Sequence, residues 1–539
     1  MIKPRHVILS IILLLGVWAL LPPPRSAGKA QARIGSDPSR TQTKNLPPTI
    51  KYVLRVNPGP LYLPGIVPAN RTTPIEGMKK VAEAFEQLHP DTRIEFIGVT
   101  GEQREWVVTQ LTGGQAPDIL QTNVEDVWQD VHKDWYVPLD RYYDAPNPFI
   151  PKGQPGSEKW WDSFKYPIPT RGTMAPNGKM YCIVLDMIET GIYYNKTLFK
   201  QLGISEPKDW NEFLAIQQRI KDAGHIPMLV DRACLADWGV DLIFEQYYGE
   251  LRDVMDLNYD PRRGEYLHGY LDWDELVFLH DQGFFTPKDQ RWHEVWRTIH
   301  EWRPYMSSEL NPQGIDLLKQ FVTKNGAMFW SHSMTVTRLE TARLDFEYGI
   351  FYLPPITQSY SRFARGKEMC VIGGSGMQYC VTNSAVSDVD ANLPFDQRIE
   401  KSERLKRTIA FLQFLTTPEN CRTVVNEQVA LLPNIKGVEP HKPLQPFDDF
   451  LKRHYSMTKW LYTFDNQWNQ VLMRMLELYA NDGIERDDFI KVLEQDLERA
   501  TRRLVKRKAI DTTPFKKVWD ERAEARKRFA DLPNPDDAK

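Results

Sequence analysis

Three short segments carry residue types that catalytic or cofactor sites use, but each has the wrong spacing or a wrong residue. His293 and Glu294 are followed only by His300, whereas zinc ligands flanking a general base on one helical face require H-E-x-x-H. Residues 172–180 resemble a phosphate-binding loop with one residue too many, and Met180 stands where a Ser or Thr would bind magnesium. Residues 373–377 read Gly-Gly-Ser-Gly-Met and not the G-x-S-x-G of a nucleophilic serine. The sequence therefore predicts no metal, no cofactor and no catalytic residue.

Acidic pairs keep one enzymatic alternative open. Asp448-Asp449 and Asp487-Asp488 stand in a chain with 71 acidic residues, so solvated helix faces are the simpler interpretation. A glycoside hydrolase, however, needs only two carboxyl groups that meet in space. A secreted or membrane-anchored glycan-active hydrolase therefore remains an alternative function.

Aromatic residues are the one compositional excess, with 16 Trp, 22 Tyr and 24 Phe in 539 residues. A large core uses many of them, but such rings also cover the flat apolar faces of a ligand. The 68 basic and 71 acidic residues give a net charge of -3. The absence of a strong field of one sign argues against nucleic acid or an anionic membrane surface as the main partner.

The start of the chain indicates the compartment. Lys3 and Arg5 precede an apolar run at 7–21, and a small-residue A-x-A pattern stands at 30–32. This is the order of a secretory signal, although an uncleaved N-terminal anchor is the alternative for residues 1–32. We therefore expect the body of the protein in the periplasm or on the extracytoplasmic face of the cytoplasmic membrane, which it contacts only if that segment stays uncleaved.

Cysteine usage indicates neither a zinc site nor a redox pair. The five cysteines are odd in number and contain no C-x-x-C: Cys182, Cys234, Cys370, Cys380 and Cys421. An exported chain permits a disulfide, and Cys370 and Cys380 flank a glycine-rich segment across which they could pair. Buried free thiols are the simpler interpretation.

Hydrophobic periodicity predicts alternating strands and helices at the beginning of the folded part. Strands are expected at 51–56, 93–99 and 118–120, with helices at 78–88, 106–112 and 124–131. This order is typical of a parallel sheet covered by helices. Further downstream we expect a helix at 208–223, a strand at 346–353, a helix at 403–416, helices over 468–505 with a break at 482–483, and a charged helix at 515–530.

Several segments occur together in the order found in one protein family. They are residues 81–86, 90 and 94–96; the turn 113–119 followed by 137–140; the stretch 178–181, 193–199, 203, 207 and 210–213; and 326–328, 353–354, 411–416 and 432–433. From about Tyr52 to about Val505 the chain resembles the sugar-binding family of periplasmic solute-binding proteins of ABC importers, which includes maltose-binding protein. It departs from the family in long insertions at 57–74 and 250–310. Residues 329–332 also differ from the family pattern, which leaves the ligand's identity open.

The resemblance implies an α/β fold of two lobes, the type II periplasmic-binding-protein fold, with the ligand between lobes joined by crossing strands. The expected division is a linker at 33–49, lobe 1 at 50–184 and 371–435, lobe 2 at 185–370 and 440–530, and a tail at 531–539. Crossings are expected near 181–189 and 370–376. The implied partners of this expected monomer are a carbohydrate ligand and the permease subunits of an ABC importer, and a binding protein for a non-sugar solute is the alternative.

Candidate ligand contacts follow strands or lie at the crossings, where the family holds its ligand. They are Thr122, Asn123, Glu125, Glu189, Asp237, Trp238, Trp330, His332, Gly373, Gly374 and Trp468. Sugars need aromatic rings for their C–H faces and planar polar groups for their hydroxyls. Glycines let the backbone approach the ligand.

Structural roles compete with binding at several positions. Asp118 is more often a turn residue, and His332 more often a structural histidine, than a ligand contact. Trp330 fits the core and the cleft equally well, as do the tryptophans at 273–302. Glu189 and Trp238 are favoured as ligand contacts.

Overall fold

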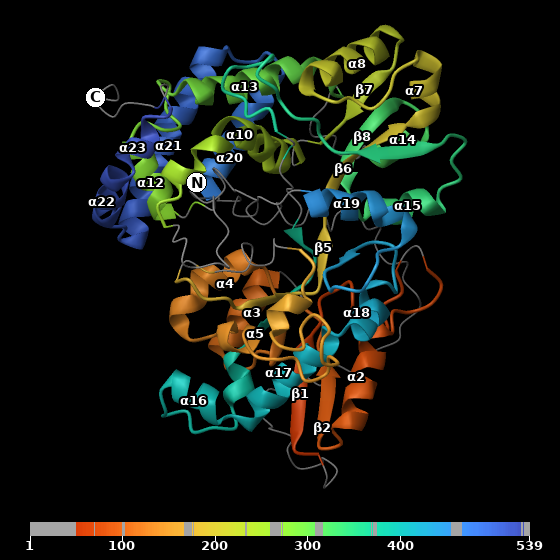
Figure 1. Cartoon of the computed structure of the whole chain (residues 1–539), viewed down its shortest axis with the longest axis vertical. Coiled ribbons are helices and arrows are strands. Elements are labelled where there is room, and N and C mark those ends of the chain that lie inside the picture. The colour runs from red at the N-terminus through yellow and green to blue at the C-terminus, as the bar shows by residue number, and fades with distance from the viewer. Residues whose placement is uncertain are drawn as a thin grey trace, which may run out of the picture.

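The computed structural model describes residues 50–68, 71–99, 103–166, 175, 177–231, 234–258, 271, 273–307, 316–367, 369, 374–453, 466–529 and 532, apart from a few side chains within helices. The expected signal or anchor segment 1–32 and the linker 33–49 lie outside the described residues, as does the tail at 531–539 except residue 532. Two lobes lie one above the other in Figure 1, with β5 (Asp186–Ile188) between them. No helix among the described residues is both long enough and apolar enough to cross a membrane.

Lobe 1 is built on a five-stranded sheet with the order β2-β1-β3-β11-β4. Its strands are β1 (Tyr52–Asn57), β2 (Thr92–Phe96), β3 (Ile119–Gln121), β4 (Cys182–Val184) and β11 (Gln378–Val381). β1 is parallel to β2 and β3, as the β-α alternation predicts, whereas β11 is antiparallel to β3 and β4. The helices are α2 (Gly77–Leu88), α3 (Gln103–Thr112), α4 (Val124–Asp130), α5 (Asp140–Tyr143), α16 (Phe395–Lys401), α17 (Glu403–Leu415) and α18 (Pro418–Val425).

Helix α2 shows how the periodic pattern becomes packing in lobe 1. Met78, Val81, Ala82 and Phe85 recur at helical spacing and are all buried. The Phe85 ring lies 5.2 Å from that of Phe411 on α17. The apolar face of α2 therefore fixes two distant parts of the chain against one another.

The turn before β3 is held by a buried ion pair. Arg404 donates to both carboxylate oxygens of Asp118, at 2.6 and 2.7 Å, and the Arg55 amide donates to the same group at 2.7 Å. Asp118 is fully buried. It is a structural residue, as the sequence analysis favoured.

Lobe 2 contains a four-stranded sheet with the order β7-β8-β6-β9. Its strands are β6 (Thr190–Asn195), β7 (Ile226–Leu229), β8 (Gly326–His332) and β9 (Tyr348–Phe351). β6 is antiparallel to β8 and β9, and β7 is parallel to β8. The accompanying helices are α7 (Lys196–Leu202), α8 (Trp210–Asp222), α14 (Leu317–Val322), α15 (Thr335–Thr341) and α19 (Gln445–Arg453).

Capping residues explain the conspicuous stretch 193–213. The side chain of Asn195 accepts the Leu198 amide at the start of α7, and Gly203 ends that helix with a φ of 61°. Asp209 caps α8 by accepting the Glu212 amide at 2.9 Å. The family-like motif in this stretch is thus a strand followed by two well-bounded helices.

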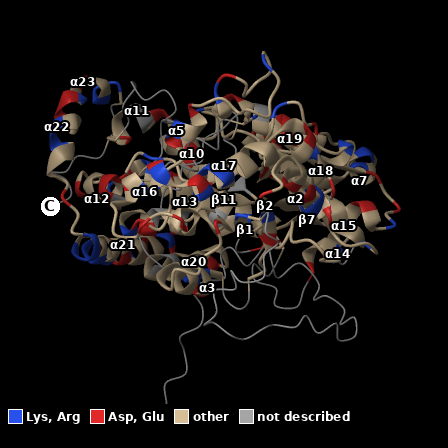
Figure 2. Cartoon of the chain, turned by 90° about the horizontal axis from the view of Figure 1, so that it is seen from below, with Lys and Arg blue, Asp and Glu red and all other residues tan. Residues whose placement is uncertain are grey.

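A large helical part extends lobe 2. It consists of α10 (Val240–Tyr248), α11 (Arg252–Met255), α12 (Trp273–Asp281), α13 (Gln290–Trp302), α20 (Asn466–Ala480), α21 (Arg486–Lys508), α22 (Thr513–Glu521) and α23 (Ala523–Arg526). The break predicted at 482–483 falls between α20 and α21. Figure 2 shows basic and acidic residues interspersed along these helices, with basic residues prominent on α21.

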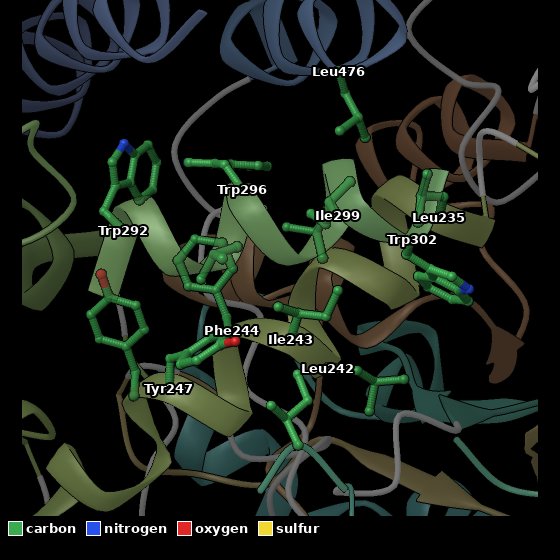
Figure 3. Close-up of a cluster of buried hydrophobic side chains, with 14 of the residues drawn as sticks. Leu235, Leu242, Ile243, Phe244, Tyr247, Trp292, Trp296, Ile299, Trp302 and Leu476 are labelled. Atoms are coloured by element: carbon green, nitrogen blue, oxygen red, sulfur yellow. The ribbon is translucent and has the colours of Figure 1, made fainter. Parts of the chain in front are cut away.

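The tryptophans of α13 form part of the core of this helical extension. Trp292, Trp296 and Trp302 are fully buried, and Figure 3 shows them beside the apolar side chains of α10. The Trp296 ring lies 5.2 Å from Phe489 on α21. Between the two interpretations of these residues, the structure supports the core, while the side chain of Trp273 lies outside the described part.

Candidate ligand-binding site at the strand crossings

Strands from three parts of the chain form a small sheet between the lobes. β5 runs from β4 in lobe 1 to β6 in lobe 2, and it pairs with β10 (Gly374–Ser375) and β12 (Leu432–Pro433) in a small antiparallel sheet. β10 leads into β11, and β12 precedes α19. β5 and β10 occur where crossings were expected, near 181–189 and 370–376, whereas β12 lies at neither of them and the exact lobe boundaries remain a prediction.

Asp186 occupies the lobe-1 end of the first crossing. It is fully buried, its Oδ1 accepts the Met377 amide at 2.9 Å, and its Oδ2 accepts the Tyr62 hydroxyl. Burial raises the pKa of Asp186 to about 7, although the Tyr62 hydroxyl and the amides of Met377 and Gly376 act in the opposite direction. A Cβ at Gly376 would collide with Oδ1, so only glycine fits beside this carboxyl group.

Glu189 lies between β5 and β6 and is also fully buried. Its Oε1 accepts the Thr190 amide at 2.6 Å and the Thr190 hydroxyl at 3.3 Å. Its carbonyl oxygen accepts the Ser333 amide at 2.7 Å. These contacts hold the predicted carboxylate at the lobe-2 end of the crossing and fix its orientation.

His332 is the last residue of β8 and faces Thr190 across the β6–β8 ladder. It is 8% exposed, and neither ring nitrogen has a hydrogen-bond partner among the residues that the structure describes. Burial lowers the pKa of His332 to about 4, so the imidazole is neutral at pH 7. A neutral imidazole has one donor and one acceptor nitrogen. Burying both nitrogens without hydrogen bonds is unfavourable.

Trp238 lies beside this histidine. Its ring centroid is 6.4 Å from that of His332 and 6.2 Å from that of Trp330. It is only partly buried, and it belongs to a π-helical turn, Leu235–Gly239, before α10. Such widened turns are frequent at functional sites. Trp238 and His332 therefore place an accessible ring next to an unsatisfied polar group.

The predicted contacts of lobe 1 follow β3. Thr122 is buried, and its amide donates to the Gln378 carbonyl at 3.2 Å. Asn123 is half-buried and begins α4 without a side-chain capping bond. The Gln378 side chain accepts the Val124 amide at 3.0 Å. Thr122 and Asn123 thus lie beside the strand β11 that leads to the second crossing.

The remaining predicted contacts lie in the lobe-2 core, in β10, or outside the described residues. Trp330 is 1% exposed on the fully buried strand β8, and Trp468 on α20 is 0% exposed, so both rings pack in the lobe-2 core and we leave them out of the site. Gly374 is in β10 opposite Ile188. Gly373 and the side chains of Glu125 and Asp237 are outside the described part of the chain.

One prediction about the acidic pairs is wrong. Asp448 is fully buried and not on a solvated face, because Lys165 pairs with it at 2.7 Å and the Tyr166 hydroxyl donates to it. Asp487 and Asp488 are exposed in the first turn of α21, as expected. No group of three or more His, Cys, Asp or Glu side chains among the described residues is arranged to hold a metal ion.

Asp186 and Tyr62 were missed by the sequence analysis. Asp186 is a single carboxylate in the otherwise apolar segment 180–188, and that isolation was the available signal. An acid in such a run must find a partner or stay protonated. Tyr62 had no comparable signal, because it lies in the long loop after β1.

The chain matches the family model described as bacterial extracellular solute-binding protein over residues 69–361, more than half of its length. It is 26% identical over 151 residues to the multiple sugar-binding protein of Streptococcus mutans serotype c. That match covers 28% of this chain and 32% of the relative, so it spans about a third of the relative's length.

Solved structures show the same fold. The apo form of RafE from Streptococcus pneumoniae gives a TM-score of 0.57 at 14% identity, covering 85% of this chain and 100% of that one. A chitin oligosaccharide binding protein gives a TM-score of 0.56 at 15% identity, and the match covers 84% of this chain and 100% of that one. Together with the family match, the two α/β lobes and their crossing strands lead to one assignment. The chain belongs to the family of bacterial extracellular solute-binding proteins.

Proposed function

We propose that this protein is the solute-binding component of an ABC importer, and that it captures a carbohydrate between its lobes and delivers it to a membrane permease. The names of the similar proteins support the ligand class: one is a multiple sugar-binding protein and another a chitin oligosaccharide binding protein. Because members of the family are extracellular, the protein acts outside the cytoplasm.

The observation that carries the proposal is the unsatisfied imidazole of His332 beside the partly buried ring of Trp238. A sugar hydroxyl both donates and accepts, so it can pair with either nitrogen of a neutral imidazole. A fully deprotonated anion such as sulfate offers acceptors only, and a polyamine ammonium offers donors only, so each could pair with just one of the two nitrogens. The indole face of Trp238 suits the C–H face of a pyranose ring.

Closure of the lobes follows from the same arrangement. Glu189, His332 and Trp238 line the lobe-2 side, and Thr122 and Asn123 the lobe-1 side, of the proposed site. A ligand that contacts both sides favours the closed form, because only that form makes both sets of contacts. We infer that the closed, loaded monomer is the form the permease recognises, and that residues 1–32 direct the chain to the periplasm or hold it at the membrane.

A thermal-shift screen tests the proposed ligand class. A ligand that binds only the native state stabilises it by about 2.7 kcal/mol at a hundredfold excess over Kd. Mono- and oligosaccharides, amino acids, polyamines and inorganic anions are added in turn, and we expect a shift with sugars only. A shift with anions or polyamines alone contradicts the carbohydrate proposal, and steady turnover of a glycan favours the hydrolase alternative.

A further inference from the structure

Cys182 and Cys380 lie directly opposite one another on the antiparallel strands β4 and β11 of lobe 1. Their Sγ atoms are 3.0 Å apart, and both residues are fully buried. Residues opposite one another in an antiparallel ladder have Cα atoms about 4.5–5.5 Å apart. The Cα atoms of disulfide-bonded cysteines are about 4.4–6.8 Å apart. The strand register alone therefore places this pair at disulfide distance.

We propose that Cys182 and Cys380 form a disulfide bond in the exported protein. The proposal rests on the extracellular nature of the family and not on the identity of the ligand. It replaces the pairing of Cys370 with Cys380 considered from the sequence, because the described partner of Cys380 is Cys182 and Cys370 lies outside the described residues.

The other described cysteines have different surroundings. Cys234 lies in lobe 2, where its thiol contacts the Asp231 carboxylate at 3.4 Å. Cys421 is buried on α18, with its Sγ 4.0 Å from the Leu185 carbonyl oxygen. Each has a described contact with an oxygen atom, and Cys421, which is buried like the pair, serves as the internal control.

The proposed bond joins the lobe-1 ends of two crossings. From the cysteine pair toward the crossings, the two strands stay paired, with Gln378 opposite Val184. The Leu185 amide then donates to the Met377 carbonyl at 3.4 Å. The Met377 amide in turn donates to the Asp186 carboxyl group. A covalent bond at the base of this ladder would hold β4 and β11 together while the lobes move. Any bending would then take place beyond Asp186.

The oxidation requires an electron acceptor, which we identify as the disulfide of a thiol–disulfide exchange protein or of a small thiol. A thiolate of the pair attacks that disulfide and forms a mixed disulfide, and the second cysteine then displaces the remaining thiol. Two protein thiols and one external disulfide thus give one protein disulfide and two external thiols. Burial, together with the neighbouring Cys182, raises the pKa of the Cys380 thiol, so this exchange belongs to folding, before the strands are covered.

Counting free thiols tests the proposal directly. The exported protein is purified without reductant, denatured in N-ethylmaleimide and weighed by mass spectrometry. Of the five cysteines, three should be alkylated before reduction and five after it. Peptide mapping should find the Cys182 and Cys380 peptides linked. Five adducts without reduction, or a link from Cys370 to Cys380, would overturn the proposal.

A melting experiment provides a second test that needs no ligand, so its failure is distinct from failure of the proposed function. Because the bond would close a loop between residues 198 positions apart, reduction should lower the melting temperature of the wild type by roughly 5–10 °C. The matched control Cys421→Ala should show the same drop, and the double variant Cys182→Ala/Cys380→Ala should show none. A reductant-dependent drop that persists in the double variant would overturn the proposal.

Discussion

Asp186 and His332 lie at opposite ends of the first crossing, and both are buried polar side chains in apolar surroundings. Asp186, on the lobe-1 side, accepts the Tyr62 hydroxyl and the Met377 amide. His332, on the lobe-2 side, has two ring nitrogens, and within the described part of the chain neither has a hydrogen-bond partner. The Asp186 carboxyl group is thus satisfied within the protein, whereas the His332 imidazole could still pair with another molecule.

This difference separates a structural role from a binding role. A buried polar group with good partners fixes one arrangement of the chain, whereas an unsatisfied one destabilises the free protein. A ligand that supplies the missing hydrogen bonds would remove this cost. We therefore propose that Asp186 holds the crossing strands together and that His332 contributes to ligand binding.

The largest effect on stability is expected from a substitution in the aromatic core of the helical extension of lobe 2. Trp296→Ala should lower the free energy of unfolding by about 3–5 kcal/mol, because its ring is fully buried among other aromatic residues. Trp238→Ala should lower it by no more than about 1 kcal/mol, because that ring is partly exposed. Urea unfolding without ligand measures both. A loss above about 3 kcal/mol for Trp238→Ala would make Trp238 a core residue and remove it from the site.

The satisfied end should tolerate a polar isostere but not truncation. Asp186→Ala leaves the Tyr62 hydroxyl and the Met377 amide without an acceptor, and should destabilise the protein by about 2–4 kcal/mol. Asp186→Asn keeps an acceptor for the amide and a donor for the Tyr62 oxygen, so it should cost less than about 1 kcal/mol at acid pH. Chemical unfolding compares the two variants. Equal losses would show that shape, and not hydrogen bonding, matters at this position.

The two ends should also respond to pH in opposite directions. Asp186 has a pKa of about 7 in the native state against an unperturbed value of 3.8, so its stabilisation is present below pH about 4 and is lost as the pH rises to 7. His332 has a pKa of about 4 against 6.5, so its contribution rises over the same range.

Unfolding free energies at about pH 5 and about pH 7.5 separate these contributions. Relative to the wild type, the stability of Asp186→Asn should rise more, or fall less, between the two pH values. His332→Phe should show the opposite change. If Asp186→Asn follows the wild-type pH profile, Asp186 is ionised in the native protein and does not carry the raised pKa.

Local sequence signals predicted the elements well where caps and periodicity act over short distances. The helix expected at 403–416 is α17, Glu403–Leu415, because Ser402 caps its start by accepting the Leu405 amide at 2.9 Å. The fold of lobe 1 could be inferred in the same way from its alternating strands and helices. These features depend on neighbours within a few residues.

Burial of individual side chains was harder to predict, because it depends on distant partners. Asp448 was expected on a solvated face, but it is buried against Lys165, which is 283 positions away. Alternation of polar and apolar residues could not tell whether Trp330 lies in the core or in the cleft. Every residue of β8 is buried, so the two faces of the strand do not differ in exposure. The candidate site was predicted by resemblance, whereas the pairing of its polar groups required the structure.

We propose that His332 supplies hydrogen bonds to a sugar, and a calorimetric titration can measure this contribution. The saccharide with the largest thermal shift is titrated into the wild type, His332→Phe and the control His300→Phe, whose exposed ring pairs with Asp482 on the surface of lobe 2. Loss of about two hydrogen bonds should weaken binding at least about tenfold in His332→Phe, while the control binds like the wild type. Phe at position 332 should also leave the ligand-free protein at least as stable, because no unsatisfied nitrogen remains. Wild-type affinity in His332→Phe would show that His332 does not contribute hydrogen bonds to the sugar.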